Sequence, residues 1–219
     1  MKEKEKQDME NLAYKTKKYT YEDLLEIDDG NRYELIDGEL YMMSSPTILH
    51  QEIVGEIFVQ LHTYLKGKKC KAFISPLDVC LSGVRNPKKE YNVLEPDVMV
   101  VCDENKISDK GIEGAPDIII EVISPSSRKH DTFVKFNLYQ YYGVKEYWIV
   151  DSEAEVIYQY ILNEQKIYTL PKTYEITEDI KICGMSYKDD YIEEIDNEED
   201  YIRVSNEIRY FDSKNKEES

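Results

Sequence analysis

Two acidic residues stand in apolar runs where a charged side chain is costly, and one lysine follows them along the chain. Asp97 lies in the apolar run of residues 94–101, and Glu121 lies in the apolar run of residues 118–123. Both runs have the length and composition of buried strands, where a carboxylate is costly to desolvate unless something compensates its charge. Lys135 follows in a segment with a helical pattern. Two such acids on neighbouring strands indicate a shared cation, and a nearby lysine indicates phosphate chemistry, as in a metal-dependent nuclease.

Strand geometry decides which of the acids can share one ion. Asp117 and Glu121 would lie roughly 13 Å apart on one straight strand, whereas neighbouring strands lie only about 4.8 Å apart. Asp97, on a different strand, can therefore converge with Glu121 on Mg²⁺ or Mn²⁺, which prefer carboxylate and water oxygens. The second Pro-Asp pair, Pro116-Asp117, is better interpreted as the start of its strand.

Apolar periodicity and turn residues predict the elements that position these side chains. Helices are predicted over residues 19–25, 46 to about 67, and 126–142. Strands are predicted over residues 33–36, 39–43, 72–81, 93–102, 117–123, 145–151 and 155–162. The order of these segments predicts an α/β fold (α+β) in which a mixed sheet lies between two helices.

Four local signals predict where these elements begin and end. Thr20 is expected to cap the first helix, and Asp37-Gly38 is a strong two-residue turn signal between the first two strands. Ser45 is expected to cap the second helix, with Pro46 at its first helical position. Gly143 is expected to end the third helix.

Length and composition are those of one ordinary domain. The chain has 219 residues, 41% of them hydrophobic, and no apolar run approaches the ~18–20 residues needed to span a bilayer. Residues 1–6 lead into no apolar segment, so we expect no signal peptide and a cytoplasmic location. We predict a flexible N-terminal segment at 1–18, a domain over 19–187 and an acidic tail at 188–219.

The four cysteines are scattered and show no CxxC spacing. They are Cys70, Cys80, Cys102 and Cys183. With a cytoplasmic location expected, reduced and partly buried thiols are favoured over disulfides or zinc ligands.

The net charge of −17 argues against nonspecific nucleic-acid binding over the whole surface. Residues 1–18 carry +2 and residues 188–219 carry −7, which leaves −12 on residues 19–187. Local basic clusters could still contact a phosphate backbone. These clusters are Lys66, Lys68, Lys69 and Lys71; Arg85, Lys88 and Lys89; and Arg128, Lys129 and His130.

The chain resembles the PD-(D/E)XK nuclease superfamily, and within it a large bacterial family of restriction-endonuclease-like proteins, the Uma-type endonucleases. The resemblance covers about residues 19–162 and implies a restriction-endonuclease-like core, with a central mixed sheet flanked by helices and an N-terminal β-hairpin. The matching residues are 33–40, His50, 95–97, 115–126, Asp131, Lys135 and 143–151.

One position departs from the superfamily pattern. The pattern places a lysine two residues after the glutamate, on the same strand face, but that position is Ile123 here. Lys135 is the best replacement, because it lies on the helix that follows the strand and Asp131 is its i−4 neighbour.

These residues suggest roles in a hydrolytic site. Asp97 and Glu121 would bind the metal, with the backbone carbonyl of residue 120 or 122 as an extra ligand, and Lys135 would orient a water or stabilise the phosphate. Glu39 and His50 match the family's N-terminal motif, as an extra carboxylate and as a phosphate or water contact. For each residue a structural role is the alternative; His62, His130 and Trp148 are interpreted as surface or packing residues.

The leading hypothesis is a Mg²⁺-dependent endodeoxyribonuclease acting on DNA as a homodimer, since cutting a duplex needs two sites. The alternative is a catalytically inactive nuclease-fold interaction or regulatory module, which the −12 charge and Ile123 favour. A third hypothesis is hydrolysis of another phosphodiester, such as RNA or branched DNA. The sequence has no GxxxxGK[ST], GxGxxG or GxSxG run, so nucleotide-dependent and serine-hydrolase functions have no support.

Overall fold

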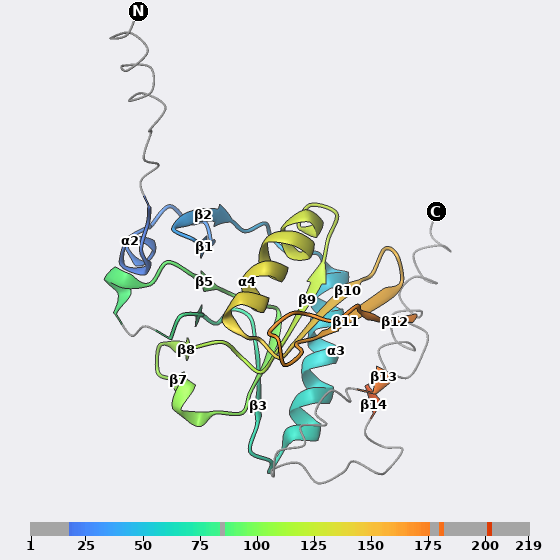
Figure 1. Cartoon of the computed structure of the whole chain (residues 1–219). Coiled ribbons are helices and arrows are strands. Elements are labelled where there is room, and N and C mark those ends of the chain that lie inside the picture. The colour runs from blue at the N-terminus through green and yellow to red at the C-terminus, as the bar shows by residue number, and fades with distance from the viewer. Residues whose placement is uncertain (1–17, 84–85, 176–179, 182–200, 203–219) are drawn as a thin grey trace, which may run out of the picture.

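A computed structural model describes residues 18–83, 86–175, 180–181 and 201–202 (Figure 1). The predicted segment 1–18 and tail 188–219 lie almost entirely outside the described residues. Within the described ranges, no helix is both long and apolar enough to cross a membrane.

A mixed six-stranded sheet forms the centre of the molecule, which confirms the predicted fold class. Its order is β12-β11-β10-β9-β6-β3; β9 and β10 run parallel and the other neighbours antiparallel. The strands are β3 (Lys71–Ile74), β6 (Val98–Val101), β9 (Ile118–Ile123), β10 (Glu146–Asp151), β11 (Val156–Ile161) and β12 (Lys172–Glu175).

A second six-stranded sheet, in the order β2-β1-β5-β4-β8-β7, was not predicted. Its strands are β1 (Tyr33–Ile36), β2 (Glu39–Met42), β4 (Val79–Cys80), β5 (Val93–Leu94), β7 (Ile107–Ser108) and β8 (Gly111–Glu113). The predicted strands 72–81 and 93–102 each break near a proline, Pro76 and Pro96, which cannot donate a backbone hydrogen bond to a ladder. Each broken segment therefore supplies one strand to each sheet. A short pair, β13 (Ile180–Lys181) and β14 (Tyr201–Ile202), lies outside both sheets.

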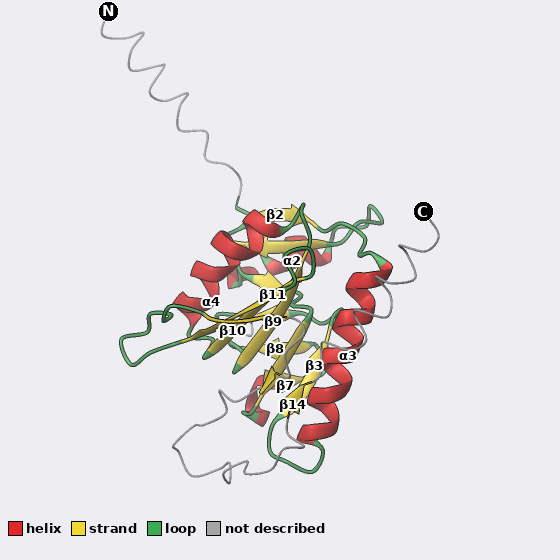
Figure 2. Cartoon of the chain, turned by 90° about the vertical axis from the view of Figure 1, so that its right-hand side faces the viewer, coloured by secondary structure: helices red, strands yellow, loops and turns green. Residues whose placement is uncertain are grey.

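The two faces of the central sheet are covered by different elements. Helix α3 (Ile48–Leu65) packs on one face, against β3, β6 and β9, whereas the second sheet and α4 (Phe136–Tyr142) cover the other. Figure 2 shows the two helices on opposite sides of the central strands. Along β9, Ile118 and Ile120 join the α3 core and Ile119 and Ile123 join the opposite core. This alternation directs Glu121 away from α3, toward α4.

The predicted helix and turn signals are confirmed near the N-terminus. Thr20 caps α2 (Tyr21–Leu25) in a reciprocal capping box with Asp23. Asp37 and Gly38 form the turn between β1 and β2 with φ values of 51° and 80°, the left-handed conformation that this turn requires.

Two helix boundaries differ from the prediction. The cap of α3 is Thr47 rather than Ser45, because the Thr47 hydroxyl accepts the backbone N–H of His50 at 3.1 Å. The third helix contains a π-helical segment, η3 (His130–Lys135), before α4. The wider turn buries both Asp131 and Lys135, and the helix ends at Gly143 as predicted, with φ 82°.

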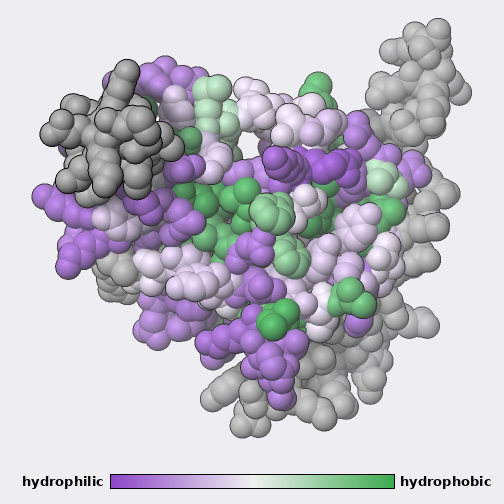
Figure 3. All heavy atoms as spheres, turned by 45° about the horizontal axis from the view of Figure 1, so that its top comes forward, coloured by the Kyte–Doolittle hydropathy of each residue, from purple (hydrophilic) through white to green (hydrophobic). Residues whose placement is uncertain are grey.

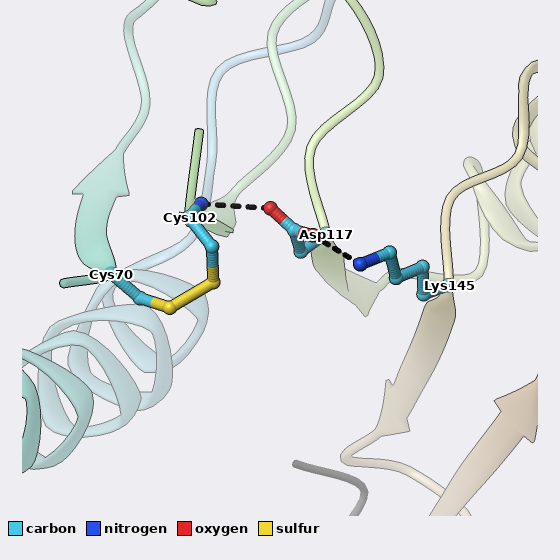
Figure 4. Close-up of a disulfide and its surroundings, with 4 residues drawn as sticks. All are labelled: Cys70, Cys102, Asp117 and Lys145. Carbon is cyan, nitrogen blue, oxygen red and sulfur yellow. Dashed lines mark hydrogen bonds and ion pairs between the residues drawn. A yellow bond between two sulfur atoms is a disulfide. The ribbon is translucent and has the colours of Figure 1, made fainter. Parts of the chain in front are cut away.

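Cys70 and Cys102 form a disulfide, so the prediction of reduced thiols was wrong for this pair. The β3–β6 register pairs Lys71 with Val101, which places the two cysteines opposite each other one residue further on. Figure 4 shows Asp117 beside the disulfide, where it accepts the backbone N–H of Cys102 at 2.7 Å and pairs with Lys145 at 3.0 Å. Asp117 lies directly before β9 and contacts residues at the ends of β6 and β10. This agrees with the prediction that Pro116-Asp117 begins its strand. Cys80 is a buried free thiol, and Cys183 lies outside the described residues.

The disulfide closes a loop across 32 positions of sequence, so replacing both cysteines by serine should lower the free energy of unfolding by about 2–4 kcal/mol. Urea denaturation of this variant and of reduced wild-type protein should give similar losses. Thiol titration of the denatured wild-type protein should rise by two groups per chain after reduction. An unchanged thiol count would show that the bond does not form.

Candidate active site

Asp97 and Glu121 meet across two antiparallel strands. The β6–β9 register pairs Val98 with Ile120, so Asp97 and Glu121 are the next opposing pair. The backbone N–H of Val122 donates to Asp97 Oδ2 at 2.9 Å, and the N–H of Asp97 points to Glu121 Oε2 at 3.4 Å. The two carboxyl groups therefore lie beside each other where the strand pair ends.

His50 contacts Asp97 from the first turn of α3. Its Nε2 lies 3.1 Å from Asp97 Oδ2, and its buried Nδ1 has no hydrogen-bond partner. Burial lowers the pKa of the His50 imidazole, but the hydrogen bond and charge of Asp97 outweigh it, so the pKa is raised overall. The side chains of His50 and Asp97 are 17% and 19% exposed, so solvent reaches both of them.

Lys135 extends from η3 into a group of carboxylates. Its Nζ lies 2.9 Å from Glu34 Oε1, 3.0 Å from Glu121 Oε1 and 3.5 Å from Asp131 Oδ1. Burial opposes the charged form, but these carboxylates raise the pKa of Lys135 well above its usual range. Lys135 is therefore a buried ammonium that neutralises part of the surrounding charge.

Glu34, to which the sequence analysis gave no role, belongs to the same group and comes from β1 of the second sheet. Its side chain is 4% exposed; Oε1 also accepts the backbone N–H of Glu95 at 3.2 Å, and Oε2 lies 3.7 Å from His130 Nε2. Burial would raise the pKa of Glu34, but Lys135 and His130 outweigh it and lower the pKa to about 2. An acid between apolar residues of the hairpin was the signal that could have found it.

Tyrosines complete the buried side of the group. The Tyr139 hydroxyl, on α4, donates to Glu121 Oε1 at 2.8 Å, and the Tyr147 hydroxyl donates to the Asp131 carbonyl at 3.0 Å. Burial raises the pKa of Glu121 to about 8, against the effect of Lys135 and with the added repulsion of Asp97, Asp131 and Glu34. Three carboxyl groups thus surround one ammonium and a fourth, that of Asp97, lies beside Glu121, an arrangement that favours a further cation.

The structure does not bring Glu39 to this group. Glu39 lies exposed on β2, opposite Ile36 and next to the hairpin turn, and its Oε2 accepts the hydroxyl of Tyr41 at 3.1 Å. Tyr41 occupies the position opposite Glu34, and its ring contacts that of His130 in a tilted arrangement with a centroid distance of 4.7 Å. Glu39 therefore lies two residues, about 7 Å, further along the hairpin than Tyr41.

Ile123 lies two residues after Glu121 and is buried in the core that the central sheet forms with the second sheet and α4. A lysine is thus missing from the usual strand position, and Lys135 brings an ammonium to the same carboxylate from the following helix.

The donor set suits a hard cation. Both described hydrogen bonds to the Asp97 side chain use Oδ2, which leaves Oδ1 for another ligand. Among the described residues, no three His, Cys, Asp or Glu side chains form a ready-made metal cluster. Mg²⁺ needs no such cluster, since it binds through one or two carboxylates and keeps several waters. Asp97 and Glu121 therefore fit Mg²⁺ or Mn²⁺ better than a structural zinc.

Two members of the predicted basic clusters are already paired with acids. Arg128 contacts Asp151 and Glu153, and Lys88 lies 3.5 Å from Glu22. The face that carries the hairpin and α4 is largely hydrophilic around a smaller apolar area (Figure 3). Arg85 lies outside the described residues.

The raised pKa of Glu121 makes stability depend on pH. The ordinary value is 4.5 and the folded value about 8, so the stabilisation from protonated Glu121 is complete below pH 4.5 and is lost as pH rises through 8. In EDTA, wild-type protein should therefore lose roughly 3–5 kcal/mol relative to Glu121→Gln between pH 5 and pH 9. Chemical denaturation across this range measures the difference, and parallel profiles would contradict the account.

Comparison with known proteins shows a family and a fold that this chain resembles. Residues 19–183 match the family model described as "Uma2: Putative restriction endonuclease". An uncharacterized protein of Synechocystis sp. (strain ATCC 27184 / PCC 6803 / Kazusa) is 26% identical over 164 residues, which are 74% of this chain and 83% of that protein.

A solved structure has a similar fold. The crystal structure of a "putative nuclease belonging to DUF820" from Anabaena variabilis ATCC 29413 aligns with a TM-score of 0.57 and 17% identity. The alignment covers 74% of this chain and 87% of that chain. Since the family model spans most of the chain, including every member of the carboxylate group, the protein belongs to the Uma2 family of restriction-endonuclease-like proteins.

Proposed function

We propose that this protein is a divalent-metal-dependent endonuclease that hydrolyses phosphodiester bonds in DNA. The observation that carries the proposal is the opposing pair Asp97 and Glu121, with the ammonium of Lys135 3.0 Å from Glu121. Family membership supports nuclease chemistry, and the site geometry supports the choice of these three residues.

Asp97 and Glu121 would hold Mg²⁺ or Mn²⁺. The ion would supply Lewis acidity that activates a water and neutralises charge on the scissile phosphate. The need for a bound cation is greater here than in a basic site, because residues 19–187 carry a net charge of −12 and would otherwise repel nucleic acid.

The protein side chains would perform distinct tasks. Val122 N–H and His50 hold Asp97 Oδ2, which orients that carboxylate. Lys135 would place positive charge where the phosphate gains negative charge in the transition state. His50, partly exposed beside Asp97, would contact the phosphate or the attacking water.

A non-catalytic member of the same fold is the second candidate. The observation in its favour is that Lys135 contacts three carboxylates, and that Glu121 is almost completely buried. Such a protein would keep the charge cluster for stability alone and would not need a divalent ion.

Asp97→Asn and Glu121→Gln should each reduce Mg²⁺-dependent cleavage at least about 100-fold, because each removes a charged ligand of the ion. They should also abolish Mn²⁺ binding measured by calorimetry. Matched controls are Asp109→Asn and Glu164→Gln, exposed acids outside the site, which should behave like wild type. Cleavage that persists in both site variants would exclude this mechanism.

Duplex DNA should be the preferred substrate, cut by a homodimer that presents two sites. Cleavage rates on duplex, single-stranded and branched DNA and on RNA, measured together with the solution mass by light scattering, test this. Faster cleavage of RNA or of branched DNA would redirect the assignment to another phosphodiester, and an active monomer that cuts only one strand would contradict the dimer.

A further inference from the structure

The ammonium of Lys135 is enclosed by carboxylates. A protonated lysine has three N–H donors, and three carboxylates from three elements surround it: Glu121 on β9, Glu34 on β1 and Asp131 on η3. The Lys135 side chain is 6% exposed. The contact with Glu121 is a hydrogen bond, and a substrate phosphate would compete with these three ion pairs for the ammonium.

The three contacts are not equivalent. Glu121 faces Asp97 and belongs to the pair suited to a cation, whereas Asp131 is the most distant partner at 3.5 Å. Glu34 is the nearest at 2.9 Å and takes no part in the Asp97–Glu121 pair. Only the Glu121 contact would compete with a divalent ion.

Glu34 is also held independently of that pair. Its Oε1 accepts the backbone N–H of Glu95, and the Glu95 carboxylate pairs with Arg32, the residue directly before β1. Glu95 lies two residues before Asp97, so Glu34 connects the lysine with the segment that leads into the metal-binding acid.

We propose that Glu34 is a positioning residue that retains the ammonium of Lys135 in the site when Glu121 engages a divalent cation. The inference rests on the proposed function and adds a residue to it. Lys135 would give up Glu121, keep Glu34 and Asp131, and turn the freed N–H toward the phosphate. Without the charge of Glu34, Lys135 would stay on Glu121 and compete with the ion for that carboxylate.

The test measures Mn²⁺ affinity by calorimetry on the full chain, in wild type, Glu34→Gln, Lys135→Gln and the double variant. Glutamine at position 34 keeps the shape and an acceptor oxygen but removes the charge. Glu34→Gln should weaken Mn²⁺ binding about tenfold, a typical coupling between two sites. In the Lys135→Gln background the same change should alter the affinity less than twofold, because no ammonium remains to compete.

Controls separate this role from a structural one. Glu39→Gln, on the exposed strand of the same hairpin, should leave Mn²⁺ affinity unchanged. Glu34→Asp keeps the charge and should recover part of the lost affinity; circular dichroism verifies that each variant folds. In cleavage assays Glu34→Gln should lower kcat more than it changes KM.

The outcomes are distinguishable. If wild-type protein binds no Mn²⁺, the proposed function fails and this inference fails with it. If wild type binds Mn²⁺ and Glu34→Gln binds equally well, only the role of Glu34 is overturned. An equal loss in the Lys135→Gln background would also overturn it, because Glu34 would then act through its own charge and not through the lysine.

Discussion

The site depends on one buried ammonium shared among carboxylates from distant parts of the chain. Removing one partner from such a group leaves an uncompensated charge, which typically costs about 3–5 kcal/mol. Lys135 therefore ties η3 to β9 of the central sheet and to β1 of the second sheet. In the proposed mechanism the same ammonium that stabilises the junction of the two sheets would also supply the positive charge for phosphate chemistry, so stability and function would share one group of atoms.

Two local features of the backbone make this sharing possible. The antiparallel register of β6 and β9 places Asp97 opposite Glu121, and a shift of one residue would direct one of them to the α3 face. The π-helical turn of η3 then brings both Asp131 and Lys135 to the buried side, which supplies an ammonium although Ile123 occupies the usual lysine position. In this chain the charge reaches Glu121 from the next element along the sequence.

Much of this arrangement could be predicted from the sequence, because the informative residues are charged and stand in otherwise apolar runs. Charged residues within apolar runs identified Asp97 and Glu121. The assumption that their strands are neighbours is confirmed by the pairing of β6 with β9. Glu34 was not identified, because an acid in a short hairpin strand is also typical of a solvent-facing position. Glu39 was selected from the same hairpin, although the turn places its side chain outside the group.

The features that sequence reasoning missed all depend on long-range pairing. The second sheet arises because prolines divide two apolar runs, and nothing local shows that the pieces join different sheets. The Cys70–Cys102 bond follows from the β3–β6 register, which a separation of 32 residues does not reveal.

The most direct test is a crystal structure of the full chain grown with saturating Mn²⁺ and measured at the manganese absorption edge. The account predicts one anomalous peak within ligand distance of an Asp97 oxygen and a Glu121 oxygen, with Lys135 Nζ still in contact with Glu34 and no longer with Glu121. A map without a peak between the two acids, in which Lys135 keeps its contact with Glu121, would contradict it.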